Sequence, residues 1–183
     1  MDLVSRAMGL LLDPQTEWRR IAAEPQATRD LLAGYVAVLA AIPAVCGFIG
    51  STLIGANILS SLLFALLGYL LTFAAVLAEA MLIAALAPMF RARKDFANAL
   101  KLAVFFPTAY WLAGVFFAVP VLSVLVLLGL YSFYLLWIGL PLLMQAPQEQ
   151  AAGYVASAAV GAIIFSAIAW TIAARIAGVS LWL

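Results

Sequence analysis

Long apolar stretches with almost no charge constrain this chain more than any other feature of its sequence. From Leu31 to the end only eight residues are charged, and the runs between them approach the roughly 20 apolar residues that a membrane-spanning helix needs. Hydrophobic residues make up 68% of the chain and charged residues 9%. A soluble domain has roughly 45–50% and about 25%, respectively. We therefore expect an all-α, polytopic integral membrane protein rather than a water-soluble domain.

Five spanning helices account for most of the chain after residue 30. Their expected ranges are about 31–55, 62–87, 96–119, 121–144 and 153–174. The short connections leave no room for a soluble catalytic domain or lid. We expect residues 1–30 to form a cytoplasmic N-terminal segment with one or two short, amphipathic, interfacial helices, and residues 31–183 to form the five-span transmembrane domain.

Basic residues are concentrated on one side of this expected arrangement. The N-terminal segment holds four of them, and the region from the end of the second span to the start of the third holds four more. The connections between the first and second spans and between the third and fourth hold none. Because basic short loops favour the cytoplasmic side, we predict that the N-terminus is inside and the C-terminus outside. The preference for arginine over lysine and the abundance of alanine indicate a bacterial source, and hence an inner membrane.

The N-terminal segment predicts two short helices. The first has one apolar face, formed by Val4, Met8, Leu11 and Leu12. Asp13 is a suitable cap for the second, with Pro14 at its first position. That second helix has an apolar side flanked by basic residues, namely Trp18, Arg19, Arg20 and Ile21. This face could lie in the lipid headgroup region, or it could pack on the protein's own cytoplasmic ends.

Glu79 is the only acidic residue within an expected span, at about 26 Å into a hydrocarbon core of about 30 Å. An ionisable group at that depth is a candidate functional site. Lys101 on the third span lies at a similar depth, so an ion pair is geometrically possible, and Asn98 is another potential partner. Glu79, on one stripe with Thr72, could therefore bind a cation or relay a proton. The alternative is a structural contact that fixes the second span against the third.

Two tyrosines share a face of the fourth span, where their hydroxyl groups need partners inside the protein. Tyr131 and Tyr134 could line a polar pocket, with further hydroxyl groups supplied by Thr72, Ser123 or Ser132. The alternative is that these aromatic rings serve only to pack the helices.

Small residues recur at four-residue spacing in two spans. They are Gly47, Ser51 and Gly55 in the first span, and Gly153, Ser157 and Gly161 in the fifth. Such rows let helix backbones approach closely, either within one chain or between copies. We expect internal packing, with homo-oligomerisation as the alternative.

The side chains that usually carry chemistry are scarce. The chain has no histidine and one cysteine, Cys46, which excludes histidine metal sites, Ser-His-Asp catalysis, disulfide frameworks and cysteine-rich zinc sites. A net charge of +1 gives no reason to expect nucleic-acid binding. We expect no metal, no cofactor and no enzymatic activity. The expected partners are the lipid bilayer and either a second copy of the chain or another membrane protein.

Two stretches of sequence are familiar: LLLDPQTEWRRIAAEP at Leu10–Pro25 and GLYSFYLLWIGLPLLMQAPQEQAAGY at Gly129–Tyr154. They resemble the N-terminal preamble and the fourth span with its following loop in the bacterial branch of the Yip domain family, the Ypt/Rab-interacting membrane proteins. Asn98–Phe117 is similar to the family's third span. The resemblance implies five spans, a cytoplasmic N-terminus and an external C-terminus. It supplies no catalytic residues.

Eukaryotic members of that family are linked to small GTPases and vesicle traffic, and they carry an acidic-Tyr-x-Gly-Pro-like motif ahead of the first span. The corresponding region here, Gln26–Tyr35, lacks the motif, which argues against small GTPase binding. We expect a non-enzymatic scaffold or adaptor that self-associates. The alternative is a small transporter, channel or lipid-moving protein that uses Glu79.

Overall fold

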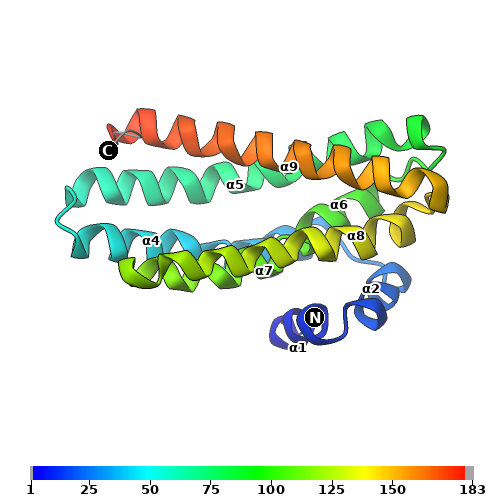
Figure 1. Cartoon of the computed structure of the whole chain (residues 1–183), viewed down its shortest axis with the longest axis horizontal. Helices are drawn as coiled ribbons and strands as arrows, with labels where there is room; N and C mark the ends of the chain where they lie inside the picture. The colour runs from blue at the N-terminus through cyan, green and yellow to red at the C-terminus, as the bar shows by residue number, and fades with distance from the viewer. Residues whose placement is uncertain (1, 180–183) are drawn as a thin grey trace.

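The computed structural model describes residues 2–179 and, within that range, consists of helices and their connections without a strand. Among the described residues, five segments are long and apolar enough to cross a membrane: Asp30–Leu53, Ile58–Phe90, Phe96–Ala118, Pro120–Met144 and Gln148–Ala177. They run along the long axis of the molecule, with two short helices beside them (Figure 1). The all-α, five-span fold predicted from hydropathy is confirmed.

The first and third spans are built from shorter helical pieces. The first consists of η1 (Asp30–Val36), α3 (Ala37–Leu39) and α4 (Ala41–Leu53), and the third of α6 (Phe96–Phe105), α7 (Thr108–Ala113) and η3 (Gly114–Ala118). Pro107 separates α6 from α7, because proline has no backbone N–H to continue the helical hydrogen bonds. The third span therefore bends at mid-length.

The remaining spans consist of fewer helical pieces. They are α5 (Ile58–Leu86) with η2 (Ala87–Phe90), then η4 (Pro120–Leu130) with α8 (Tyr131–Met144), and finally α9 (Gln148–Ala177). α5 begins at Ile58 rather than at Leu62 because Asn57 caps it, its side chain accepting a hydrogen bond from Ser60 N at 3.0 Å. α9 begins before residue 153, because its polar first turn is helical although hydropathy does not mark it.

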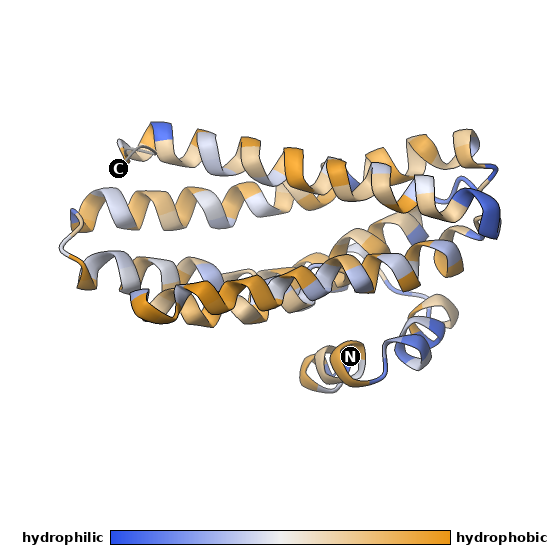
Figure 2. Ribbon diagram, viewed as in Figure 1, coloured by the Kyte–Doolittle hydropathy of each residue, from blue (hydrophilic) through white to orange (hydrophobic). Residues whose placement is uncertain are grey.

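The charged residues of the bundle gather at one end. Arg91, Arg93 and Lys94 lie in the connection between η2 and α6, and the Arg93 backbone N–H donates to the Met144 carbonyl at 2.8 Å. We call this the basic end, and we call the opposite end, with the connection at 54–57, the far end. Figure 2 shows hydrophilic residues gathered at the basic end and apolar residues along the spanning helices.

The third span lies at the centre of the bundle. Of its most apolar window 67% is buried, against 17–33% for the other four spans. At the basic end α6 packs on α5, α8 and η1, and residues 99–105 are all buried. Toward the far end the helices form a row, with α9 on α5, α5 on α4, α4 on η3 and η3 on η4. The bundle therefore closes around α6 only at the basic end.

The two N-terminal helices are α1 (Leu3–Leu12) and α2 (Pro14–Ala23). Asp13 joins them and caps α2 as expected, its side chain accepting a hydrogen bond from Thr16 N at 3.3 Å. Pro14 occupies the first helical position, where its missing N–H is not needed. The two helices therefore meet at a sharp, capped corner.

The apolar side of α2 packs on the protein itself. Trp18 and Ile21 are fully buried, whereas Arg19 and Arg20 are exposed. α2 lies on α8, where a Cβ atom at Gly139 would come within 2.6 Å of the Trp18 ring. Of the two alternatives for this face, the structure shows packing on the bundle. The other alternative, in which the Trp18 side of α2 lies in the headgroup region, is wrong because the Trp18 ring is fully buried against the bundle.

Candidate functional site

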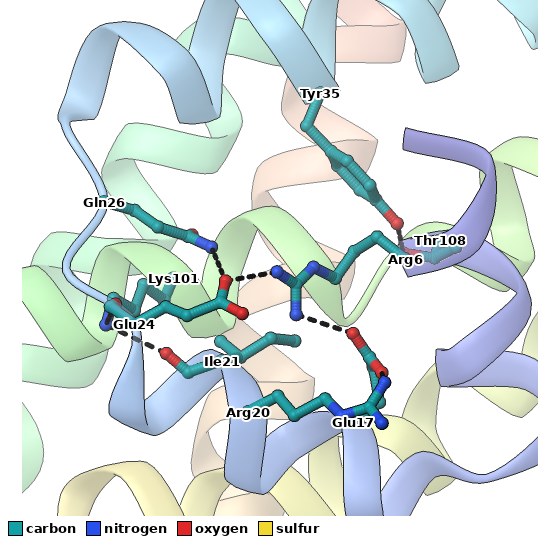
Figure 3. A network of polar contacts seen from close by, with 9 residues as sticks. All are labelled: Arg6, Glu17, Arg20, Ile21, Glu24, Gln26, Tyr35, Lys101 and Thr108. Atoms are coloured by element: carbon teal, nitrogen blue, oxygen red, sulfur yellow. Dashed lines mark hydrogen bonds and ion pairs between the residues drawn. The ribbon is translucent and has the colours of Figure 1, made fainter. Parts of the chain in front are cut away.

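A buried charge network joins α1 to α2 (Figure 3). The Arg6 guanidinium donates to Glu17 Oε1 at 2.6 Å and also binds Glu24. Arg20 approaches the other Glu17 oxygen at 3.5 Å. The side chains of Arg6 and Glu17 are each only 7% exposed, so their pairing compensates for the loss of water around both charges. Arg6 thereby holds α2 near its first turn and at its C-terminal cap.

A polar cavity of about 280 Å³ lies between these two helices, lined by Asp2, Ser5, Arg6, Glu17, Arg20 and Glu24. Its long charged side chains are already engaged with one another. A ligand entering the cavity would have to compete with these ion pairs. The arrangement thus suits fixing two helices better than capturing a charged molecule.

Lys101 fastens the C-terminal end of α2 to the spanning bundle (Figure 3). Its ammonium group donates to the carbonyl oxygens of Ile21 and Glu24, at 3.0 and 2.6 Å. The last carbonyl groups of a helix have no partner within the helix, and the helix dipole favours a cation there. A lysine from the third span therefore caps α2.

The predicted ion pair between Glu79 and Lys101 is wrong. α6 turns Lys101 toward α2, and its ammonium group is occupied by the helix-end carbonyls. Asn98 does not bind Glu79 either, because its side-chain amide donates to Asp95 and to the Leu143 carbonyl, each at 3.3 Å. Similar depth in the membrane did not imply that these side chains face each other.

Phe105 lies where the N-terminal helices meet the first and third spans. The Arg6 guanidinium carbon lies 5.9 Å from the centre of its ring, and the rings of Trp18 and Tyr35 meet it edge-on at 6.4 and 4.7 Å. The Tyr35 hydroxyl is hydrogen-bonded to the Thr108 hydroxyl at 2.8 Å. One aromatic ring thus contacts α1, α2 and η1 at once, and it links the charge network to the core.

Glu79 is a residue of α5 whose side chain lies against α9, and it is 3% exposed. A Cβ atom at Gly161 would come within 3.1 Å of Glu79 Oε2, so the missing side chain of Gly161 makes room for the carboxyl group. Among residues 2–179, neither carboxyl oxygen has a hydrogen-bond partner. Thr72, on the same stripe of α5, donates to Gly68 O at 2.9 Å within its own helix. Glu79 therefore stands alone as the intramembrane polar candidate.

Of the two alternatives for Tyr131 and Tyr134, the structure favours separate packing contacts over a shared polar pocket. Tyr131 donates to the Leu11 carbonyl of α1 at 3.2 Å, and the two tyrosine rings lie 5.2 Å apart. Tyr134 is 48% exposed. Ser132 accepts from Tyr110 N at 3.0 Å, and Ser123 donates within its own helix. These hydroxyl groups serve separate local contacts because they lie on different faces and levels of the fourth span.

The small residues of the fifth span are used for internal packing. Gly153 lies under the Phe90 ring, which stacks on the Tyr154 ring at 4.9 Å, and Gly161 receives Leu82 and Glu79 of α5. Ser157 donates to the carbonyl oxygen of Gly153 at 2.9 Å. These contacts let α9 lie close along α5.

The small residues of the first span have a different environment. A Cβ atom added at Gly47 or Gly55 would meet no atom within 4 Å. Ser51, between them, donates only to Phe48 O in its own helix, at 2.9 Å. The glycine of α4 that does make a close contact is Gly50, which lies against the carbonyl group of Phe117. Gly55 lies beyond the end of α4, in the turn at 54–57, where its backbone is left-handed with φ 85°. The predicted row of three is therefore reduced to Gly47 and Ser51 on α4, and no neighbouring helix fills this face at Gly47.

Arg6, Glu17 and Glu24 were not among the predicted site residues, although a signal for the two buried ones, Arg6 and Glu17, was present. Arg6 lies among the apolar residues of the inner face of α1, and Glu17 adjoins Trp18 on the inner face of α2. Opposite charges on the apolar faces of consecutive helices indicate a buried pair. The partners of Lys101 had no such signal, because they are backbone carbonyl groups.

Together these features define a class: an integral membrane protein of five spanning helices, with an N-terminal helix pair fastened to one end by buried charges. Within that class the chain belongs to the Yip1 domain family, whose family model matches residues 8–171. The match includes α2, most of the spanning bundle, and the residues Glu17, Glu24 and Lys101.

Known relatives agree with this assignment. The chain is 26% identical over 180 residues to the inner membrane protein YohC of Escherichia coli K12, covering 90% of this chain and 92% of that protein. The inner membrane protein YohC of Escherichia coli O6:H1 (strain CFT073) gives the same identity and coverage. No solved structure matches the chain.

Proposed function

We propose that this protein is a non-enzymatic scaffold or adaptor of a bacterial inner membrane. One observation carries the proposal: four charged residues pair with one another or with a helix end, and so fix α1 and α2 on the bundle. They are Arg6, Glu17, Glu24 and Lys101. A helix pair held in this way offers a partner a surface of constant shape. The inner membrane location named for the Escherichia coli relatives supports the same membrane here.

The distribution of basic residues supports a cytoplasmic basic end in this proposal. Eight of the nine lie in the N-terminal segment or near the basic end: Arg6, Arg19, Arg20, Arg29, Arg91, Arg93, Lys94 and Lys101. The ninth, Arg175, lies near the end of α9, which runs toward the far end. Because basic residues flanking spans favour the cytoplasmic side, this distribution supports a protein with its N-terminus inside and its C-terminus outside.

Self-association through the small-residue stripe of α4 is the testable part of the scaffold proposal. In a Cys46→Ala background, we expect Ser51→Cys to form a disulfide-linked dimer when native membranes are mildly oxidised. The reason is that Ser51 lies one helical turn after Gly47, where an added Cβ atom would meet no neighbouring helix within 4 Å, so a second backbone can approach there. The dimer is measured as the band that disappears on reduction in gel electrophoresis.

The matched control is Ile49→Cys, also on α4 and 42% exposed, but about 160° away around the helix from Ser51. It should give little dimer under the same oxidation. Equal crosslinking at both positions would indicate random collision. If neither cysteine crosslinks, two copies do not meet at this stripe and the self-association proposal fails.

Transport is a second candidate, favoured by the carboxyl group of Glu79. Its two oxygens are buried without a partner among the described residues. Burying a carboxylate in this way has a large free-energy cost in a membrane unless a proton or a cation occupies the site. For protein in liposomes, we expect any proton or cation flux above that of empty vesicles to be lost in Glu79→Gln. Ion-sensitive dyes inside the vesicles report the flux.

Glu149→Gln is the control for this measurement, because Glu149 is an exposed carboxyl group in the first turn of α9. It should leave the flux unchanged. Equal flux in wild type and Glu79→Gln would remove Glu79 from any transport path. No flux above empty vesicles, with folded protein, would leave the scaffold as the working function.

A further inference from the structure

The outer face of α1 is apolar, although α1 is not one of the spanning helices. Val4, Met8 and Leu12 recur at four-residue spacing and are 62%, 53% and 77% exposed. On the opposite face Arg6 is 7% exposed and is held by Glu17 and Glu24. A helix that faces water turns its charges outward and its apolar side inward. α1 does the reverse.

The direction of α1 suits a helix lying in the plane of a membrane. In Figure 1 the spanning helices run horizontally, whereas α1 is seen nearly end-on beneath them. α1 therefore crosses the spanning helices and does not run along them. If the spanning helices cross the bilayer, α1 lies along its surface or within one leaflet.

One hydrogen bond fixes the level of α1 along the fourth span. Tyr131, the first residue of α8, donates to the carbonyl oxygen of Leu11 at 3.2 Å. From the far end to Tyr131, η4 contributes 11 residues, or about 22 Å at the rise of a 3-10 helix. If the hydrocarbon core, about 30 Å thick, begins at Pro120 at the far end, its other boundary falls about 8 Å beyond Tyr131. In-plane helices insert about 5–10 Å below such a boundary.

The aromatic residues of α8 mark the same level. Trp137 is six residues beyond Tyr131, or about 9 Å along the helix, and it is 52% exposed. Tyr134, between them, is 48% exposed. Exposed tryptophan and tyrosine are typical of the membrane–water interface. These aromatic residues therefore indicate that the lipid-facing part of α8 ends near Trp137, about one and a half turns beyond the residue that contacts α1.

We propose that α1 is an in-plane membrane anchor, which inserts Val4, Met8 and Leu12 among the acyl chains of the leaflet at the basic end. The hydrocarbon boundary then passes close to Trp137. The remainder of α8, the first part of α6 and the α2 helix that packs on them stand outside the hydrocarbon core. This inference depends on the five spanning helices and on neither proposed function.

The test measures the surroundings of the outer face of α1 in the full chain. In a Cys46→Ala background a nitroxide spin label is attached at Met8→Cys, and the protein is placed in vesicles of phosphatidylethanolamine and phosphatidylglycerol. Collision rates with oxygen, which concentrates in lipid, and with a water-soluble nickel chelate are then compared. Leu66→Cys on α5, 51% exposed, provides the lipid reference, and the exposed polar position Gln15→Cys on α2 provides the water reference.

We expect the oxygen-to-nickel ratio at Met8 to be close to that at Leu66 and several-fold above that at Gln15. Labels at Val4→Cys and Leu12→Cys must give the same order, so that a local disturbance at one site does not decide the outcome. A ratio equal to that at Gln15 would overturn the proposal, because the face would lie in water. The proposal would also be overturned if both reagents were excluded and the spectrum of the label showed spin–spin broadening that disappears when the labelled protein is diluted with unlabelled protein. That result would mean that a second copy of the chain covers the face.

Discussion

Replacing Arg6 with methionine is expected to release α1 and α2 from the bundle, at a cost of about 3 kcal/mol or more. The substitution leaves the Glu17 carboxylate, 7% exposed, without its 2.6 Å partner and with Arg20 only at 3.5 Å. The contribution of Glu24 is smaller because its side chain is 49% exposed. Hydrogen exchange of the α2 backbone, followed by mass spectrometry, should accelerate by about 100-fold or more.

Arg20→Met is the matched control, since Arg20 is 65% exposed and its contact with Glu17 is long. Exposed ion pairs contribute about 0–1 kcal/mol, so exchange in α2 should change little. Adding Glu17→Leu to Arg6→Met should restore much of the protection, because it removes the unpaired buried charge. If Arg6→Met and Arg20→Met behave alike, the buried network does not hold the helix pair.

We expect Gly50→Ala to cause a clear decrease in the thermal unfolding midpoint of the purified protein in detergent. A Cβ atom at Gly50 would overlap the carbonyl oxygen of Phe117, which belongs to the backbone and has no rotamer by which to move away. α4 and η3 would have to separate, and overpacking of this kind costs about 1–3 kcal/mol. Gly47→Ala, on the same helix, adds the same methyl group where no atom lies within 4 Å.

The Gly47→Ala midpoint should stay near that of the wild type. The comparison isolates the contact with Phe117, because the two variants share the substitution and the helix. Equal midpoints would mean that α4 and η3 do not approach as closely as the structure places them.

Features determined within a short stretch of sequence were predictable. Hydropathy marks the five spans because each run of apolar residues must be covered by lipid or protein along its own length. The corner between α1 and α2 was predictable because Asp13 and Pro14 act within one helical turn. The division of the third and fourth spans into α-helical and 3-10 pieces was not, since it depends on how Gly114 and Gly129 pack against neighbouring helices.

The candidate site was predicted less well. The depth of a residue along a helix follows from the local sequence, whereas the neighbour that its side chain faces depends on how the helices pack. Sequence placed Glu79 and Lys101 at the same level, but the rotation of α6 in the core turns Lys101 toward carbonyl groups of α2. Every residue has a backbone carbonyl group, so the sequence does not indicate which carbonyl groups bind Lys101. Glu79 was found because a carboxyl group within an apolar run is conspicuous wherever it faces.

The position of Lys101 also bears on the order in which the protein is assembled. Translation produces the N-terminal helices before the third span, so the carbonyl groups of Ile21 and Glu24 exist when Lys101 leaves the ribosome. α8, which covers another side of α6, is made only afterwards. The third span has the lowest mean hydropathy of the five. The carbonyl partners of its lysine are therefore synthesised before the span itself. The N-terminal helices thus supply hydrogen-bond acceptors for the charged residue of the third span before the fourth span is made.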